Sequence, residues 1–259
     1  MSQQLETHSN LLRLLSYNIQ VGSHTSRYRH YVTRSWRQLI PNRSQMENLD
    51  AISRLLQTYD FVGLQEVDGG SFRTGFINQT AYLANKAGFE YWFTQPNRNI
   101  GQLAKHSNGF LSRYEPTRAM HIKLPGLPGR GALVSEFNYG EESFAIFVVH
   151  LALAGRSQKR QFEFLAHLAC RYKHFVFMGD FNQEIQHQPM LQLLHDSGLQ
   201  SCQMNLPTFP SWRPQRRLDH ILVSRHLHIQ SAAVLDYALS DHLPVQIDIT
   251  LPDTVRLVA

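Results

Sequence analysis

The chain has 259 residues, of which 42% are hydrophobic, so it is long enough to bury a sizeable core. Its formal net charge of +5 favours an anionic partner, although soluble proteins without such a partner often carry a similar charge. Two cysteines and the lack of any long apolar run exclude a disulfide framework, a thiolate metal site and a transmembrane helix, so we expect a cytoplasmic protein.

The first half of the chain predicts strands that alternate with helices. Residues 1–10 are polar and are expected to be frayed, whereas residues 11–259 should form a single domain because no linker or repeat interrupts them. Apolar runs at residues 11–15 and 61–64 predict buried strands. Between them lies an arginine- and aromatic-rich segment, residues 27–43, followed by an amphipathic helix.

The rest of the chain continues this alternation but adds hairpins. Helices are expected at residues 75–87, 157–172 and 189–195. Short strands are expected at residues 91–93, 109–111, 132–137, 144–151, 175–178, 221–223, 229–234 and 245–249. Recurring hairpins argue against one parallel sheet and favour two mixed β-sheets with helices on the outside.

One predicted strand ends in a motif that can carry chemistry. The apolar residues 175–178 run into Gly179, and Asp180 and Asn182 follow. On an extended chain, residues two apart point in the same direction, so this carboxylate and this amide should face one space. Glycine allows the backbone to turn or to approach a ligand closely there. The alternative is an ordinary polar turn.

The same arrangement recurs at other predicted strands, where an apolar run stops at a polar residue. These polar residues are Asn18, Glu66, His150, Asp180 with Asn182, Asp219 with His220, and Asp241 with His242. Ligands commonly bind where the carboxyl ends of strands gather. Oxygen ligands without thiolates favour Mg²⁺, or Mn²⁺, over zinc.

Six short motifs together resemble the endonuclease/exonuclease/phosphatase superfamily, which has the DNase I-like fold. They are Tyr17-Asn18, Leu64-Gln65-Glu66-Val67, Val149-His150-Leu151, Gly179-Asp180-Phe181-Asn182, Leu218-Asp219-His220-Ile221 and Ser240-Asp241-His242-Leu243-Pro244. Asn108-Gly109 resembles a further pair of this superfamily. The resemblance implies an α/β four-layer sandwich, with two mixed β-sheets packed face to face and helices on the outside.

The resemblance also implies a role for each polar residue at a strand end. Glu66 would be the principal metal ligand, helped by Asn18 and Asp241. Asp180 would position and activate the attacking water, and Asn182 would donate a hydrogen bond to a non-bridging phosphate oxygen.

Three further residues complete the implied catalytic set. His242 would lie over the phosphate as a charged donor or proton carrier, with Asp219 fixing its tautomer and raising its pKa. His150 would act on the leaving-group side as a donor or acid, although no carboxylate partner for it can be identified in the sequence. His220 is expected to be structural.

Substrate contacts are expected from basic and aromatic residues around this set. Candidates are Arg34, Arg37, Asn108, Arg156, Trp212 and Arg213, and for most of these a solvated surface is the alternative. The expected function is a divalent-metal-dependent phosphohydrolase, acting as a monomer on an anionic, phosphate-containing substrate. Nucleic acid is the first choice of substrate, with cleavage as an endonuclease or exonuclease. Inositol phosphates or phospholipid head groups are the second choice, and a non-catalytic anion-binding module is the remaining alternative.

Overall fold

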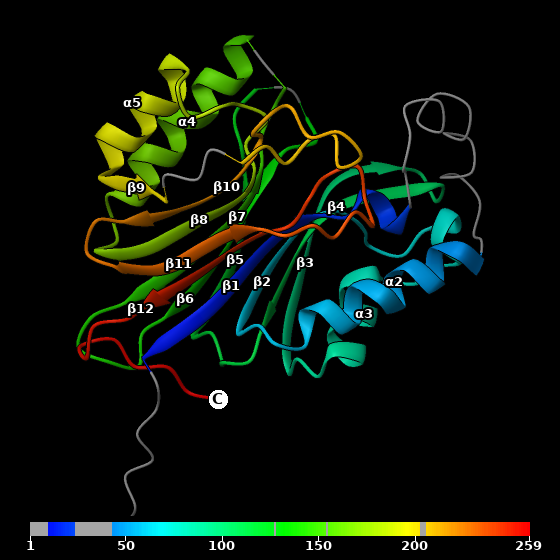
Figure 1. Ribbon diagram of the computed structural model, residues 1–259, viewed down its shortest axis with the longest axis horizontal. Helices are drawn as coiled ribbons and strands as arrows, with labels where there is room; N and C mark the ends of the chain where they lie inside the picture. The colour runs from blue at the N-terminus through cyan, green and yellow to red at the C-terminus, as the bar shows by residue number, and fades with distance from the viewer. Residues whose placement is uncertain (1–9, 24–42, 127, 154, 203–205) are drawn as a thin grey trace, which may run out of the picture.

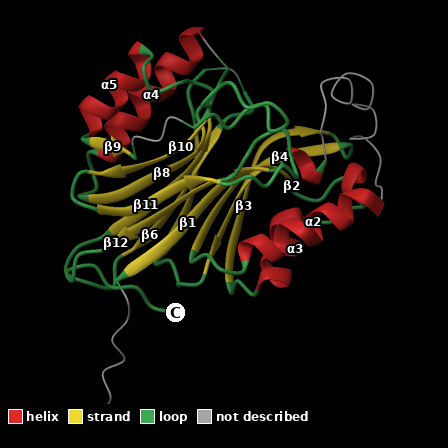
Figure 2. Cartoon of the chain, viewed as in Figure 1, coloured by secondary structure: helices red, strands yellow, loops and turns green. Residues whose placement is uncertain are grey.

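Two six-stranded sheets lie face to face, with helices packed on their outer faces (Figures 1 and 2). The computed structural model describes residues 10–23, 43–126, 128–153, 155–202 and 206–259. The predicted α/β four-layer sandwich of two mixed sheets is confirmed. None of the described helices is both long and apolar enough to cross a lipid bilayer. The frayed segment expected at residues 1–10 lies almost wholly outside the described residues.

The first sheet is mixed, with one parallel pair at its centre. Its strands, in spatial order, are β11 (His228–Val234), β12 (Val245–Thr250), β1 (Leu11–Asn18), β2 (Phe61–Asp68), β4 (Ala104–Ser112) and β3 (Tyr91–Ile100). Only β1 and β2 run parallel to each other. The outer face is covered by α2 (Arg43–Leu56) and α3 (Gln79–Ala87), and two short 3-10 helices, η1 (Gln20–Gly22) and η3 (Phe72–Thr74), follow β1 and β2.

The second sheet has the same design. Its strands, in spatial order, are β5 (Arg118–Lys123), β6 (Gly131–Phe137), β7 (Phe144–His150), β8 (His174–Asp180), β10 (Asp219–Ser224) and β9 (Leu199–Ser201). Its single parallel pair is β7 with β8. The outer face is covered by α4 (Gly155–Ala169) and α5 (Gln188–Ser197), which lie at the upper left in Figure 1.

The main core fills the space between the two sheets. The ring of Phe61 from the first sheet lies 5.3 Å from the ring of Phe137 and 6.2 Å from that of Phe144, both in the second sheet. Gly63 marks a close approach of the sheets, because a Cβ atom there would lie 2.5 Å from the sulfur of Met178. Apolar packing of this kind holds the relative position of the sheets.

Several elements differ in extent from the sequence prediction. Helix α3 begins at Gln79 rather than at residue 75, because the side chain of Asn78 accepts hydrogen bonds from the amides of Thr80 and Ala81 and caps the helix there. Strand β3 continues past Pro96, which edge strands tolerate because their outer N–H groups need no partner in the sheet. Strand β5 was not predicted, because it is a partly exposed edge strand.

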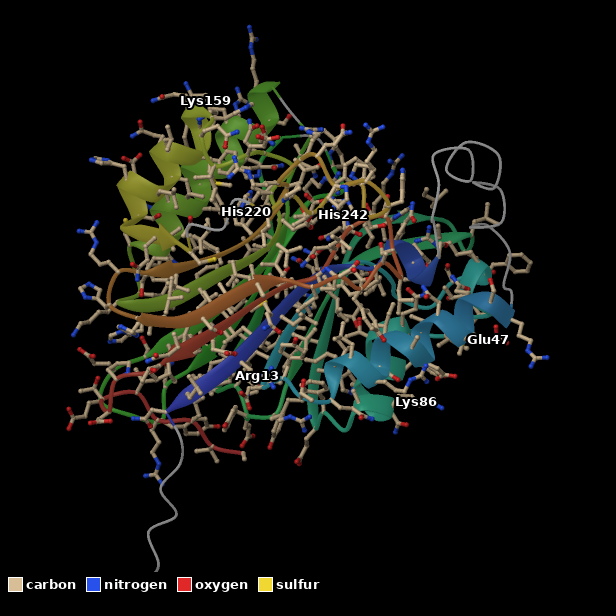
Figure 3. The ribbon with its side chains drawn as sticks, in the orientation of Figure 1. Arg13, Glu47, Lys86, Lys159, His220 and His242 are labelled. Atoms are coloured by element: carbon tan, nitrogen blue, oxygen red, sulfur yellow. The ribbon has the colours of Figure 1, made fainter. Side chains whose placement is uncertain are left out.

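The topology brings the polar strand ends together. Each parallel pair ends at the same edge of the molecule, so Asn18 closes β1 while His150 and Asp180 close β7 and β8. The register then places His150 beside Asp180, and Asp180 beside Asp219 on β10. In Figure 3, His242 lies near the upper ends of the central strands, whereas Arg13 lies toward their lower ends.

Candidate active site

Asp180 occupies the centre of the site and is fixed from both sheets. The preceding Gly179 has a φ of +149°, and a Cβ there would lie 1.9 Å from the carbonyl oxygen of Val149, so no other residue fits. One carboxylate oxygen of Asp180 accepts a hydrogen bond from the amide of Asn182 at 2.9 Å. The other accepts one from the side chain of Asn18, in the opposite sheet, at 3.2 Å.

Asp219 and His242 form the hydrogen-bonded pair that the sequence prediction requires. Nδ1 of His242 lies 2.7 Å from Oδ2 of Asp219. The hydroxyl of Thr208 donates to the same oxygen at 2.5 Å, which fixes the carboxylate. Nε2 of His242 lies 3.9 Å from Oδ2 of Asp180, so the free side of the imidazole faces the centre of the site.

The electrostatics of the site follow from burial and from like charges. Burial lowers the pKa of His242, but the carboxylates of Asp219, Asp180 and Asp241 outweigh it and raise the pKa to about 10. Burial raises the pKa of Asp180 to about 7, and the negative charges of Asp219 and Glu66 add to that effect. These surroundings favour the imidazolium form of His242 and disfavour the charged form of Asp180.

Glu66 lies at an irregular point of β2, where the backbone leaves regular strand geometry. Pairing with β4 shifts its register between Leu64 and Val67, and Glu66 takes a φ of +56°, in the left-handed region that disfavours side chains. Its side chain is 34% exposed, more than the other carboxylates of the site. The bulge therefore aims one carboxylate outward, where it can reach a ligand.

His150 has a neighbour that the sequence reasoning missed. A guanidinium nitrogen of Arg130 lies 2.9 Å from Nε2 of His150, and Nε2 of His150 also lies 3.5 Å from Oδ2 of Asp180. Because a guanidinium can only donate, Nε2 accepts from Arg130. Burial and the charge of Arg130 hold the pKa of His150 well below its usual range. In this arrangement Nε2 accepts rather than donates, and a role of His150 on the leaving-group side stays a prediction.

Asp241 precedes His242 in the sequence, and the segment that contains Phe209 and Ser211 contacts both residues. Burial raises its pKa to about 6, and the hydroxyl of Ser240 donates to it at 3.2 Å. Its backbone carbonyl accepts from the amide of Ser211 at 2.7 Å. The ring of Phe209, in the same segment as Ser211, lies 4.8 Å from that of His242. The segment that precedes Asp219 in the sequence thus packs onto Asp241 and His242.

The residues expected to bind substrate lie at different depths. Arg34 and Arg37 lie outside the described residues. Arg156, in the first turn of α4, and Arg213 are exposed, and Trp212 is half-buried. Direct contact of these three side chains with a substrate stays a prediction.

Asn108 does not have the position expected of a substrate contact. Its side chain is fully buried, and its amide donates to the carbonyl of Gly131 at 3.1 Å and to Gln95 at 3.3 Å. It therefore supports the loop that carries Arg130. His220 contacts the carbonyl of Gln183 through Nε2 at 2.8 Å, in agreement with its expected structural role.

A cavity of about 470 Å³ opens beside Glu66 and His150. It is lined by Glu66, Asn97, Arg98, His106, Ser107, Pro128, Gly129, Arg130, His150, Ala152, Leu153 and Ser157. Its walls come from the β3–β4 hairpin, the loop before β6 and the segment after β7.

The donor set fits a divalent cation. Within the described residues, ligand atoms of Asp180, Asp219 and His242 lie within 4.8 Å of one another. A hydrogen bond between Asp219 and His242 already explains why these two side chains lie so close together, since a proton is shared between them and no cation is needed there. Glu66 and Asp180 repel each other across the site, and a cation bound there would offset this repulsion.

Residues 15–242 match the model of the Endonuclease/Exonuclease/phosphatase family. The chain belongs to this family. Members of the Endonuclease/Exonuclease/phosphatase family are in general metal-dependent hydrolases of phosphate esters, and the site described above offers a candidate metal position. No curated protein matches the chain.

Solved structures share the fold of this chain at low sequence identity. A member from Beutenbergia cavernae is 20% identical, with a TM-score of 0.75 over 94% of this chain and 72% of that one. A mannosyl-6-phosphatase from Bacteroides thetaiotaomicron is 17% identical, with a TM-score of 0.66 over 93% of this chain and 100% of that one. The human Nocturnin catalytic domain, with a bound sulfate anion, is 18% identical, with a TM-score of 0.66 over 93% and 94%.

Proposed function

We propose that the protein is a divalent-metal-dependent phosphohydrolase that cleaves phosphate esters by in-line attack of water. The observation that carries this proposal is the placement of Asp180, whose Oδ2 lies 3.5 Å from Nε2 of His150 and 3.9 Å from that of His242. A buried carboxylate whose pKa is raised to about 7 can accept a proton near neutral pH. A non-catalytic anion-binding module has no need of such a group.

Glu66, with Asn18 and Asp241, would hold Mg²⁺ or Mn²⁺. These side chains offer the oxygen atoms that such cations prefer. When bound, the cation would neutralise charge on the phosphate and so favour attack at phosphorus.

The other side chains of the site have complementary tasks in this mechanism. Asp180 orients the attacking water and takes its proton. Asp219 holds Nδ1 of His242, so that the imidazolium presents Nε2 to the phosphate as negative charge builds on it. Asn182 donates one N–H to the carbonyl of Leu151 at 3.0 Å and keeps a second N–H for a non-bridging oxygen.

We propose nucleic acid as the first substrate class. The net charge of +5 and the basic segment at residues 27–43 support a polyanionic substrate. Phosphorylated small molecules such as inositol phosphates form the second class, which is favoured by the volume of about 470 Å³ and the two arginines of the cavity beside Glu66. Phospholipid head groups are a further candidate and are included in the substrate panel below.

A substrate panel tests both the reaction and the class. It contains plasmid, single-stranded DNA, RNA, inositol phosphates and phospholipids, each assayed with Mg²⁺, with Mn²⁺ and with chelator. We expect activity on at least one substrate that is lost in chelator and in Glu66→Ala. Circular dichroism should show that this variant remains folded. Full activity of Glu66→Ala in chelator would contradict the proposal.

A further inference from the structure

The loop before β6 holds Arg130 in a fixed position. Gly129 has a φ of +103°, a backbone conformation that favours glycine. At Gly131 a Cβ would lie 2.3 Å from the side-chain oxygen of Asn97, so a larger residue there would displace the side chains packed against it. Asn108 donates to the carbonyl of Gly131 at 3.1 Å. The chain on both sides of Arg130 is thus determined by close contacts, which limits where its guanidinium can lie.

The guanidinium of Arg130 has unused donors. It contacts Nε2 of His150 at 2.9 Å, and no carboxylate of the described residues lies within 4.0 Å of it. A guanidinium carries five N–H donors in a planar fork that matches the oxygens of phosphate. One neutral acceptor leaves most of this capacity free, on a side chain that faces the cavity.

A second arginine lines the same cavity. Arg98 is exposed on the β3–β4 hairpin, and its stem lies near Gly129, where a built Cβ would be 3.5 Å from it. Within the described part of the chain the side chain of Arg98 forms no ion pair or hydrogen bond. The cavity is lined by these two arginines and by one carboxylate, that of Glu66, so its charged lining is positive on balance. A positive lining attracts an anion.

We propose that this cavity binds a second phosphate group of the substrate, separate from the phosphate that is hydrolysed. This inference rests on the proposed hydrolysis at Asp180, because the cavity adjoins that site through Glu66 and His150. Arg98 and Arg130 would share the oxygens of the second phosphate. His106, Ser107 and Ser157 supply further polar groups to the same walls.

The second phosphate has two chemical sources. It is either a separate phosphate on a small molecule, such as a nucleoside bisphosphate, or the neighbouring phosphate of a polynucleotide. Both present the same tetrahedral oxyanion to the arginines, so the choice between them is made by experiment.

Binding to the inactive Asp180→Asn variant, measured by calorimetry with Mg²⁺ present, tests the inference without turnover. Adenosine 3′,5′-bisphosphate is compared with adenosine 5′-monophosphate, and a 5′-phosphorylated dinucleotide with the same dinucleotide lacking that phosphate. We expect the second phosphate to tighten binding at least about tenfold in one of these pairs, since charge-assisted contacts to arginine are strong. The pair that shows the preference identifies the source.

Two substitutions, each added to Asp180→Asn, decide whether the cavity is responsible. Arg98→Gln and Arg130→Gln should each reduce the preference, whereas Arg118→Gln should leave it intact. Arg118 lies opposite Glu136 at the other end of β6, so the Arg118→Gln substitution removes an equal charge far from the cavity. Arg98 is exposed, so its replacement does not endanger folding.

The outcomes separate the two proposals. No preference in either pair, or a preference that survives both arginine substitutions, overturns the second-phosphate site even when the wild-type enzyme hydrolyses phosphate esters. A preference lost in Arg98→Gln, in a protein that hydrolyses nothing in the substrate panel, supports the binding site while contradicting the proposed reaction.

Discussion

The two ends of strand β8 each carry a buried histidine paired with a carboxylate. At the end of β8, His242 lies next to Asp180 and contacts Asp219 at 2.7 Å. At the start of β8, His174 contacts Glu142 at 2.6 Å. Both histidine side chains are less than 10% exposed. A histidine and a carboxylate at nearly the same distance therefore occur at both ends of strand β8.

The neighbours of each pair differ. Glu142 is also contacted by Lys173 and by the hydroxyl of Thr254, and the hydrogen bonds from Lys173, His174 and Thr254 lower its pKa to about 2. Its charge is thus balanced, and it ties the β6–β7 turn to the C-terminal segment. Around His242, by contrast, the carboxylates of Asp219, Asp180 and Asp241 outnumber the cations. We infer that the pair at the start of β8 serves stability, whereas the other serves chemistry.

The largest expected effect comes from neutralising one carboxylate at each end of β8. Asp180→Asn should lower kcat by about a thousandfold, because it removes the proposed base. Its melting temperature should stay the same or rise, since burial already disfavours the charged carboxylate. Glu142→Gln should do the opposite, with a lower melting temperature and unchanged kcat. If Asp180→Asn retains most of the activity, the division between the two ends is wrong.

Replacing the two histidines gives the next largest effect. His242→Ala should lower kcat by roughly a hundredfold, and by more than it weakens substrate affinity, because its contact strengthens in the transition state. His174→Ala should keep kcat and lower the melting temperature by a few degrees, because Glu142 loses one partner. Steady-state kinetics and calorimetry on both variants check this. Equal kinetic losses in the two variants would contradict it.

The pH dependence provides a smaller and more specific test. Activity should rise as Asp180 loses its proton near pH 7 and should fall as His242 loses its proton near pH 10. Because the folded pKa of His242 is raised, its stabilising effect is complete below about 6.5 and is lost as the pH passes 10. Asp219→Asn removes the leading cause of that raised pKa, so the alkaline decline should move to lower pH with a moderate rate loss. If the loss of activity at alkaline pH occurs at the same pH in this variant, a group other than His242 causes it.

The smallest expected effect concerns the basic segment at residues 27–43. If nucleic acid is the substrate, Arg34→Gln with Arg37→Gln should weaken binding a few-fold and reduce the slope of log Kd against log salt by about 1 to 2. Arg118→Gln with Arg171→Gln is the matched control, since both arginines are exposed and lie far from the catalytic edge. Equal slopes in the two double variants would show that this segment does not contact the phosphates.

Much of the fold could be predicted because apolar runs that end in polar residues mark both the strands and the site. Asn18, Asp180 and His150 follow such runs, and parallel pairing then gathers their side chains at one edge. The edge strand β5 escaped prediction, since its side chains alternate only weakly between buried and exposed.

Arg130 could not be found from the sequence by pattern alone. It lies between two glycines in a proline-rich loop, where no apolar run points to it. Its place is set by pairing, because Ala132 opposes Val149 and the residues before Ala132 therefore lie opposite His150. The hairpin of residues 132–137 and 144–151 was predicted, so extending its register by two residues was the signal that could have located Arg130.

The close approach at Gly63 has a consequence for which substitutions could alter the proposed activity. Gly63 faces the Met178 side chain across the core, and the two strands reach Glu66 and Asp180 only three and two residues later. An added methyl group at Gly63 would push the sheets apart at the point that sets the spacing between the proposed metal ligand and the proposed base. Random mutagenesis for altered activity should therefore yield variants deep in the core at Gly63 and Met178, and compensating pairs should restore volume there.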